Sequence, residues 1–411
     1  MSGWSVDTGL RTSASQYPLG HRIGEQALVD DPYPIYLRLQ QEEPISWIAP
    51  LNMWWVVGYR DVVEILNDTD HFTTASPNST IQDTFGLQML SAEGDIHARY
   101  KRAAMPAFQP TALRRALEAD IVVWTDDLIS RLPDRGADIR KSFAALLPIR
   151  TMIGLFGLPL QNLPDIRRWY DDFEAALANF AGDQTVRRSA HASVLEFHGL
   201  LAQVLAEVRA GRQEGLLGHL VQQGLSDEEI VRNASIIMFG GISTVEALIL
   251  NSLWALAMHP ETDARVRADR SLLTAVIEEV LRWQSPVQSA TRHVVKPIDY
   301  RGHRFEAGDT VNCMIAAANR DPILVSDPDL FDIDRRPQPR HLAFASGPHF
   351  CLGFRLAKLQ ARIALDRLYG RLEGFAVIEP SRHRPRGYEF RQPRSLPVVW
   401  DDVSPFAGVP V

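Results

Sequence analysis

The sequence is poor in cysteine and carries no excess of basic charge. Its 411 residues include 2 cysteines, Cys313 and Cys351, so disulfides are not what organises the fold. The formal net charge of −7 gives no reason to expect a nucleic-acid partner. The amino terminus has no basic stretch followed by an apolar run, so we expect no signal peptide and a cytoplasmic location.

Long hydrophobic runs are also scarce. Residues 234–258 form one candidate, because Glu246 is their only charged residue and the run is long enough to span a bilayer. The run nevertheless contains glycine, serine, threonine and asparagine, and a helix that is apolar on most sides equally fits the centre of a large protein. We therefore expect a buried central helix and no membrane contact.

The rest of the pattern is mainly helical. Hydrophobic residues make up 45% of the chain, enough for a large core. Helical spacing occurs at residues 61–66, 112–132, 166–177, 190–212 and 272–283, and strand-like runs occur at 53–57, 294–295, 304–311 and 398–399. We expect a mainly α fold with small β-sheets (α+β), forming one domain over residues 1–411 with a loosely ordered segment at 1–25.

Cys351 lies in a glycine- and proline-rich loop, residues 344–353, that a helical pattern follows. In that pattern Leu356, Leu359 and Ile363 recur at spacings of three and four. Unpaired backbone N–H groups at the start of a helix stabilise a thiolate, the form of cysteine that binds metal. The alternative is an ordinary buried cysteine, which behaves as a small hydrophobic residue.

This loop resembles the haem-binding loop of the cytochrome P450 family, which has the pattern Phe-Gly-x-Gly-x-His-x-Cys-x-Gly. The matching positions are Phe344, Gly347, His349, Cys351 and Gly353. Ala345 stands where glycine is usual. The resemblance implies a cytochrome P450-like fold in which haem b lies between the long central helix and the helix after the cysteine. It also implies that Cys351 is the axial ligand of the haem iron.

The similarity extends along the whole chain. Residues 31–34 resemble the family's motif before its first helix, and Glu279 and Arg282 match its Glu-x-x-Arg motif. Residues 331–335 resemble the segment that supplies a second arginine, here Arg335. The resemblance implies a structural network of Glu279, Arg282 and Arg335 that serves folding and haem incorporation. The alternative is a surface ion pair at i, i+3 worth under about 1 kcal/mol.

The two propionates of a haem need cationic or hydrogen-bonding partners. For these the resemblance points to His97, Lys101, Arg292 and His349, and it places Phe344 beside the haem as well. His97 and Lys101 are four residues apart and would share one helix face. The family more often has arginine at position 101. Lys101 replaces the two parallel hydrogen bonds that an arginine can donate to a carboxylate with a single compact charge. Taken alone, each of the four propionate candidates equally fits a solvated surface group.

The central helix carries the run Gly240-Gly241-Ile242-Ser243-Thr244. Two glycines inside a helix cost about 1 kcal/mol each, which indicates either close helix packing or space kept for a ligand. The resemblance implies the second interpretation. In that case the groove at Gly241 leaves room for dioxygen, and Thr244 offers the oxygen a hydrogen bond.

Ser243 stands where the family has an acid. A carboxyl group at that position normally helps to relay protons, and a serine hydroxyl passes a proton only through water. Glu246 lies three residues further on and offers a substitute carboxyl through a water chain. The alternative is that Glu246 is a buried carboxylate paired with a distant cation.

The resemblance implies a soluble bacterial monooxygenase that uses dioxygen to oxidise a hydrophobic small molecule. No flavin or iron–sulfur motif is recognisable, so we expect electrons to come from a separate ferredoxin and its NAD(P)H reductase. We also expect the protein to be a monomer. Basic residues expected to face the ferredoxin are Arg99, Arg102, Arg355, Lys358 and Arg362.

By the same resemblance, residues 173–180 would form a lid, and the residues expected to line the substrate pocket are Ile237, Phe239, Gly240, Val287 and Phe390. The missing acid leaves open peroxide-driven or non-hydroxylating chemistry, such as coupling or isomerisation. A haem-binding sensor without catalysis is a further alternative.

Overall fold

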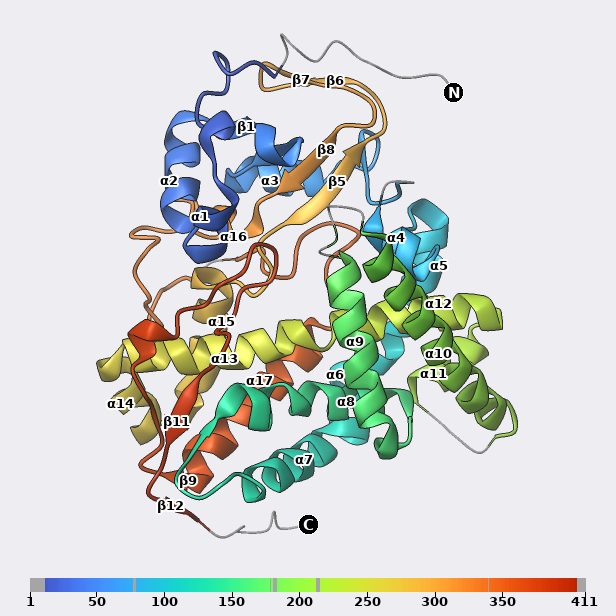
Figure 1. Cartoon of the computed structure of the whole chain (residues 1–411), viewed down its shortest axis with the longest axis vertical. Coiled ribbons are helices and arrows are strands. Elements are labelled where there is room, and N and C mark those ends of the chain that lie inside the picture. The colour runs from blue at the N-terminus through green and yellow to red at the C-terminus, as the bar shows by residue number, and fades with distance from the viewer. Residues whose placement is uncertain are drawn as a thin grey trace. The chain divides into compact units, whose positions relative to one another are not determined.

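The computed structural model describes residues 12–76, 79–177, 179, 183–211, 215–338 and 340–404 (Figure 1). Helices dominate this part of the chain and the sheets are small, so the predicted mainly α fold with small β-sheets is confirmed. Two compact units are present. One comprises Met1–Thr74, Leu281–Phe350 and Pro385–Arg391, and the other comprises Ala75–Val280, Cys351–Arg384 and Gln392–Val411. The single-domain organisation stays a prediction.

A five-stranded sheet organises the first unit. Its order is β1-β2-β8-β5-β3, with β2 and β8 parallel and the other pairs antiparallel. Its strands are β1 (Ile45–Ile48), β2 (Met53–Val56), β3 (Phe72–Thr73), β5 (Ala290–Val294) and β8 (Thr310–Cys313). Trp54 on β2 is fully buried and meets Trp47 and Phe305 edge to face. Aromatic and β-branched side chains pack well on the pleated surface of a sheet, which explains why residues of these types form the strands.

The segment before β1 is packed rather than loose. Tyr17 is 2% exposed, lies edge to face with Trp54 at 5.2 Å between ring centroids, and has its hydroxyl 2.6 Å from Nδ1 of His303. The expectation of a loosely ordered stretch over residues 1–25 is therefore wrong for Tyr17. Residues 1–11 of that stretch lie outside the described residues.

Short helices complete the first unit, and most of the helices belong to the second. The helices before the central pair are α1 (Glu25–Asp30), α2 (Tyr33–Glu42), α3 (Tyr59–Asn67), α4 (Thr80–Phe85), α5 (Gly94–Ala104), α6 (Pro110–Leu113), α7 (Ala119–Ser130), η5 (Arg140–Ala144), α8 (Leu146–Phe156), α9 (Leu163–Leu177), α10 (Gln184–Arg209) and α11 (Leu216–Gln222). Those after it are α14 (Pro260–Ala268), α15 (Leu273–Trp283), α16 (Ile315–Ala318) and α17 (Phe354–Arg371).

The smaller sheets are the β6–β7 hairpin, a two-stranded pair of β9 and β12, and a three-stranded sheet in the order β10-β11-β4. Their strands are β4 (Gly136–Asp138), β6 (Ile298–Tyr300), β7 (His303–Phe305), β9 (Leu372–Glu373), β10 (Ala376–Val377), β11 (Pro397–Val399) and β12 (Asp402–Val403). The run 304–311, expected as one strand, is divided between β7 and β8. A turn at Gly308, with a φ of +92°, separates the two strands, and glycine adopts this left-handed conformation without strain.

The predicted central helix is two helices, α12 (Asp227–Gly240) and α13 (Ser243–Met258). The expected long central helix is present but locally interrupted, because the backbone departs from helical geometry at Ile242. There the Thr244 hydroxyl donates a 2.8 Å hydrogen bond to the carbonyl of Gly240. The most apolar window of α12 and α13 is 78% buried within the protein, as expected for a core helix. Figure 1 shows α13 in yellow, and α13 packs against α17 in orange-red.

Candidate active site

The loop before Cys351 is fixed by two unusual backbone conformations. Gly347 has a φ of +74°, and a Cβ at this position would lie 2.5 Å from the carbonyl oxygen of Leu66 at the end of α3. Ala345 has a φ of +60°, in the left-handed region that glycine occupies most easily. This conformation explains why glycine is usual at position 345 and why alanine there is strained.

Cys351 is exposed and lies three residues before α17 begins at Phe354, so this helix starts slightly later than the sequence pattern predicts. Burial by the surrounding protein raises the pKa of the Cys351 thiol, whereas the backbone N–H groups of Gly353 and Phe354 and the ammonium of Lys101 lower it. Because N–H donors and a cation stabilise the thiolate, this sulfur is suited to bind a metal.

Helix α5 brings Lys101 close to this sulfur. Burial lowers the pKa of Lys101, and the charge of the Cys351 thiolate opposes that shift. His97, one turn earlier on α5, is buried at 6% exposure. The predicted helical pair therefore exists, and its lysine faces the cysteine.

The other predicted haem contacts lie in the first unit. Arg292 on β5 is 5% exposed and donates a 2.9 Å hydrogen bond to the carbonyl of Thr291. His349 has Nε2 3.5 Å from the hydroxyl of Thr74, and Phe344 lies 6.5 Å from Phe350 between ring centroids. The roles of His97, Arg292, His349 and Phe344 toward haem stay predictions.

The two glycines of the central run have different surroundings. A Cβ on Gly241 would lie 2.5 Å from Sδ of Met152 on α8, whereas a Cβ on Gly240 would meet nothing within 4 Å. Close helix packing therefore explains Gly241. The open side belongs to Gly240, which is exposed, and Ile237 and Thr244 are partly accessible although most of α12 and α13 is buried. These positions recur at helical spacing, so they form one accessible stripe.

Behind this stripe, Ser243 and Glu246 are buried at 4% and 2% exposure. Nε of Arg140 lies 2.7 Å from Oε1 of Glu246, with its N–H not aimed at that oxygen, so the contact is an ion pair and not a hydrogen bond. Arg167 on α9 lies 4.0 Å from the other carboxylate oxygen. Burial raises the pKa of Glu246, and the two arginines oppose that shift. The interpretation of Glu246 as a paired buried carboxylate is thus supported.

Two further residues of α9, Tyr170 and Glu174, lie close to Ser243. Ser243 lowers the pKa of both, although burial raises the pKa of each overall. Sequence reasoning missed this cluster, because α9 and the central run are about 70 residues apart and no motif relates them.

The Glu-x-x-Arg region brings its two arginines together. Arg282 and Arg335 both donate to the carbonyl of Leu330, at 2.9 and 2.8 Å. Arg282 also donates to Pro328 at 2.7 Å, so this 1% exposed guanidinium holds the loop that precedes Phe331. Glu279 is buried at 4% exposure. The part of this network formed by Glu279 stays a prediction.

The predicted pocket residues fall into two groups. Val287 and Phe390 form an isolated antiparallel bridge in the first unit. Phe239 on α12 stacks on Tyr170 with 5.5 Å between ring centroids and is 7% exposed, so it contributes to the core at the base of the accessible stripe. In the proposed lid, Phe173 is 2% exposed and packs on Phe85, but residues 178 and 180–182 lie outside the described residues.

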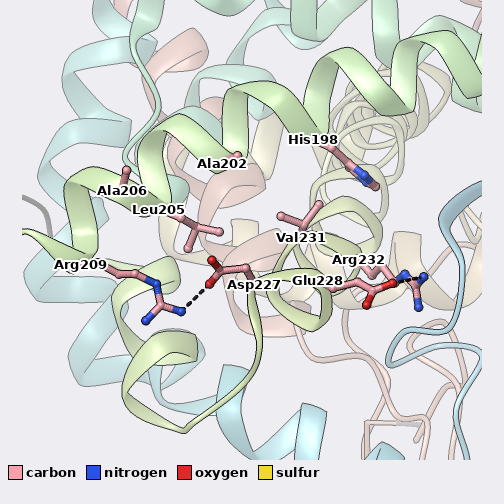
Figure 2. Close-up of a pocket in the computed structure, with 9 residues that line it drawn as sticks. All are labelled: His198, Ala202, Leu205, Ala206, Arg209, Asp227, Glu228, Val231 and Arg232. Atoms are coloured by element: carbon pink, nitrogen blue, oxygen red, sulfur yellow. Dashed lines mark hydrogen bonds and ion pairs between the residues drawn. The ribbon is translucent and has the colours of Figure 1, made fainter.

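A separate recess of about 490 Å³ lies between α10 and α12 (Figure 2). Its lining includes the apolar side chains of Leu205 and Val231. An ion pair joins Arg209 on α10 to Asp227 on α12, and Glu228 and Arg232 pair within α12. None of the predicted site residues lines it. We regard it as a surface groove apart from the cysteine site.

A cysteine sulfur beside two backbone N–H donors just before α17, together with an interrupted central helix, is an arrangement suited to a thiolate-bound metal cofactor. The family model for cytochrome P450 matches residues 184–385. Cytochrome P450 monooxygenase PikC of Streptomyces venezuelae is 34% identical over 368 residues, which are 86% of each chain. Vitamin D(3) 25-hydroxylase of Pseudonocardia autotrophica is 29% identical over 85% of this chain and 88% of that one.

Among solved structures, P450BioI in complex with an acyl carrier protein ligated to hexadec-9Z-enoic acid aligns with a TM-score of 0.85. The two are 26% identical, over 92% of this chain and 100% of that one. The chain belongs to the cytochrome P450 family of monooxygenases. The family implies a haem cofactor, and the accessible sulfur of Cys351 with its two N–H donors fits that group.

Proposed function

We propose that the protein uses haem b and dioxygen to oxidise a hydrophobic small molecule, inserting one oxygen atom and reducing the other to water. The observation that carries this proposal is the environment of Cys351, an accessible sulfur beside the N–H groups of Gly353 and Phe354. When bound, a haem with a thiolate ligand supplies the electron density that favours O–O cleavage.

The chain's own residues would hold this cofactor and handle protons. Cys351 would bind the iron, and His97, Lys101, Arg292 and His349 would meet the propionates, each on the family's motif. Thr244 would offer a hydrogen bond from the accessible stripe, with Gly240 leaving space beside it and Gly241 letting α8 pack against the break. Ser243 and Glu246 would take part in moving protons from behind that stripe.

The assignment of the ligand is tested with the two cysteines as a matched pair. Cys351→Ala should abolish the red-shifted carbon monoxide band of thiolate-bound ferrous haem. Cys313→Ala should keep it, because Cys313 is fully buried on β8 and burial raises the pKa of its thiol to about 12. Retention of the thiolate band by Cys351→Ala would contradict the proposal.

Ser243 in place of an acid favours a second candidate, peroxide-driven or non-hydroxylating chemistry. The two candidates are separated by assaying product from a panel of apolar compounds with NADPH and a ferredoxin–reductase pair, and with peroxide alone. Product only with peroxide would favour the second candidate. A protein that binds haem but gives product under neither condition would favour the non-catalytic sensor.

Electrons are proposed to come from a separate ferredoxin and NAD(P)H reductase, and the protein to be a cytoplasmic monomer without a nucleic-acid or membrane partner. The proposed docking surface needs revision at three positions. Arg99 is paired with Glu229, Lys358 with Glu278 at 2.6 Å, and Arg362 with Glu118 at 3.2 Å. These acids cancel much of the positive charge that the sequence suggested. Arg102 and Arg355 are exposed and have no ion pair within the described residues.

A further inference from the structure

Two buried hydroxyl groups behind the accessible stripe lie close together without a well-formed hydrogen bond. The Ser243 Oγ and Tyr170 hydroxyl atoms are buried and make no hydrogen bond of normal geometry to any group in the described ranges. Leaving such groups unsatisfied costs about 1–3 kcal/mol each. Buried waters typically bridge polar groups of this kind. The two hydroxyls are therefore suited to share a water.

Glu174 completes this cluster from the same face of α9 as Tyr170, four residues away. Ser243 is close enough to both side chains to lower their pKa values. Glu174 is partly accessible, in contrast to the 4% exposed Ser243 and the 2% exposed Glu246. Its carboxyl group thus lies between solvent and a buried hydroxyl next to Thr244.

The charge balance indicates which carboxyl holds a proton. The charged groups that face Glu174 are Arg140 from η5, Arg167 and Asp171 from α9, and Glu246 from α13. Arg140 lies at 2.7 Å from Glu246, and Arg167 lies at 3.3 Å from Asp171, which has 56% of its side chain exposed. Both guanidinium groups therefore have a carboxylate partner other than Glu174. Burial is the main cause that raises the pKa of Glu174, and the negative charge of Asp171 raises it further.

We propose that Glu174 is the proton-relay residue that replaces the missing acid at position 243, acting through a water held by Ser243 and Tyr170. The O–H bond of Glu174 breaks as its proton passes to the water, the water gives a proton to Ser243 Oγ, and Ser243 releases its own hydroxyl proton toward the stripe. No electron moves in this step. The Glu174 carboxylate then takes a new proton from solvent.

This inference rests on the proposed function, since dioxygen and electrons must be supplied for the proton to be consumed. It gives Glu174 a role that Glu246 is less suited to, because Glu246 is only 2% exposed and is paired with Arg140. General acid catalysis typically contributes 10²–10⁴-fold, and a leak through water would reduce that figure. We therefore expect a loss of at least about tenfold without the Glu174 acid.

The test compares Glu174→Gln with Asp165→Asn, which removes an exposed carboxylate from the same helix. Without any turnover, infrared difference spectra of the holoprotein should show a protonated carboxyl stretch that titrates in the wild type and in Asp165→Asn and is lost in Glu174→Gln. With a ferredoxin pair and a substrate, Glu174→Gln should form at least about tenfold less product per NADPH. Glu174→Asp should recover part of that loss.

A double variant keeps the proposal testable if Glu174→Gln is generally damaging. Ser243→Asp supplies an acid at the usual place, so it should make Glu174 dispensable. The double variant Ser243→Asp/Glu174→Gln should then form as much product per NADPH as Ser243→Asp alone. The relay is wrong if Glu174→Gln and Asp165→Asn give the same product per NADPH, the same pH dependence of turnover and the same infrared spectrum. Failure of the proposed function would instead appear as a wild type without the thiolate band or without dioxygen-dependent product.

Discussion

Sδ of Met152 on α8 lies 2.5 Å from the position that a Cβ on Gly241 would occupy, while the equivalent position on Gly240 is open. The two adjacent glycines therefore serve different purposes. Gly241 lets α8 approach the break between α12 and α13, and Gly240 keeps the accessible stripe free of side chains.

This difference predicts that alanine substitutions at the two glycines affect stability differently. Gly241→Ala should destabilise the protein by about 1–2 kcal/mol, because overpacking forces the Met152 side chain to move. Gly240→Ala should change stability by no more than about 1 kcal/mol but narrow the space beside Thr244. Urea unfolding measures both effects. Met152→Ala should relieve most of the penalty of Gly241→Ala, and purely additive effects in the double variant would contradict the contact.

The cysteine loop gives a second pair of substitutions. Ala345→Gly should stabilise the protein by up to about 1 kcal/mol, because alanine at a φ of +60° is strained. Gly347→Ala should destabilise the protein, and by a larger amount, because the alanine Cβ would meet the backbone carbonyl oxygen of Leu66. The measurement is the midpoint of thermal unfolding together with haem content. A stable, fully haem-loaded Gly347→Ala protein would show that the loop has another conformation.

The cysteine loop could be predicted from sequence because its chemistry is local: Phe344, His349 and Cys351 lie within one short window. The helices at residues 166–177 and 272–283 were predictable for a similar reason, since one buried face dictates their spacing. The break at Ile242 was not, because it depends on how the Thr244 hydroxyl bonds to Gly240 and on how Met152 fits Gly241. The cluster of Tyr170, Glu174 and Ser243 depends on tertiary packing alone.

A partly buried carboxyl in the first unit should make stability depend on pH. Glu389 receives a 2.8 Å hydrogen bond from the Ser289 hydroxyl, and burial raises the pKa of Glu389 to about 7, with Ser289 opposing that shift. The folded state then holds a proton that the unfolded state, with a pKa near the ordinary value of about 4.3, has released. The stability from this group is fully present below about pH 4 and is lost as the pH rises through about 7.

Glu389→Gln should therefore flatten the fall in stability between about pH 5 and 8, a fall of at most about 3 kcal/mol for this group. Urea unfolding at several pH values between these limits measures the slope. Glu42→Gln is the matched control, because Glu42 is exposed on α2 and, among the described residues, forms an ion pair only with Arg38. An unchanged slope in Glu389→Gln would show that Glu389 is ionised throughout this range.

The exposed arginines near the cysteine helix predict how reduction depends on charge. Arg102 lies in the last turn of α5, and the guanidinium of Arg355 lies over the Phe354 ring at the start of α17. Both side chains are exposed, so their charge is available to a partner. Complementary charge chiefly raises the association rate. Arg102→Glu/Arg355→Glu should therefore slow ferredoxin-driven reduction several-fold, and the defect should shrink at high ionic strength as charges are screened.

Stopped-flow reduction at low and high salt measures this effect, with substrate-binding spectra expected to stay unchanged. Arg38→Glu is the matched control, since Arg38 is an exposed arginine on α2 of the other unit. Lys358→Glu is a poorer probe, because it would place two carboxylates together beside Glu278 and destabilise the helix pair. Equal reduction rates for the wild type, Arg38→Glu and the double variant at low salt would place the electron donor elsewhere.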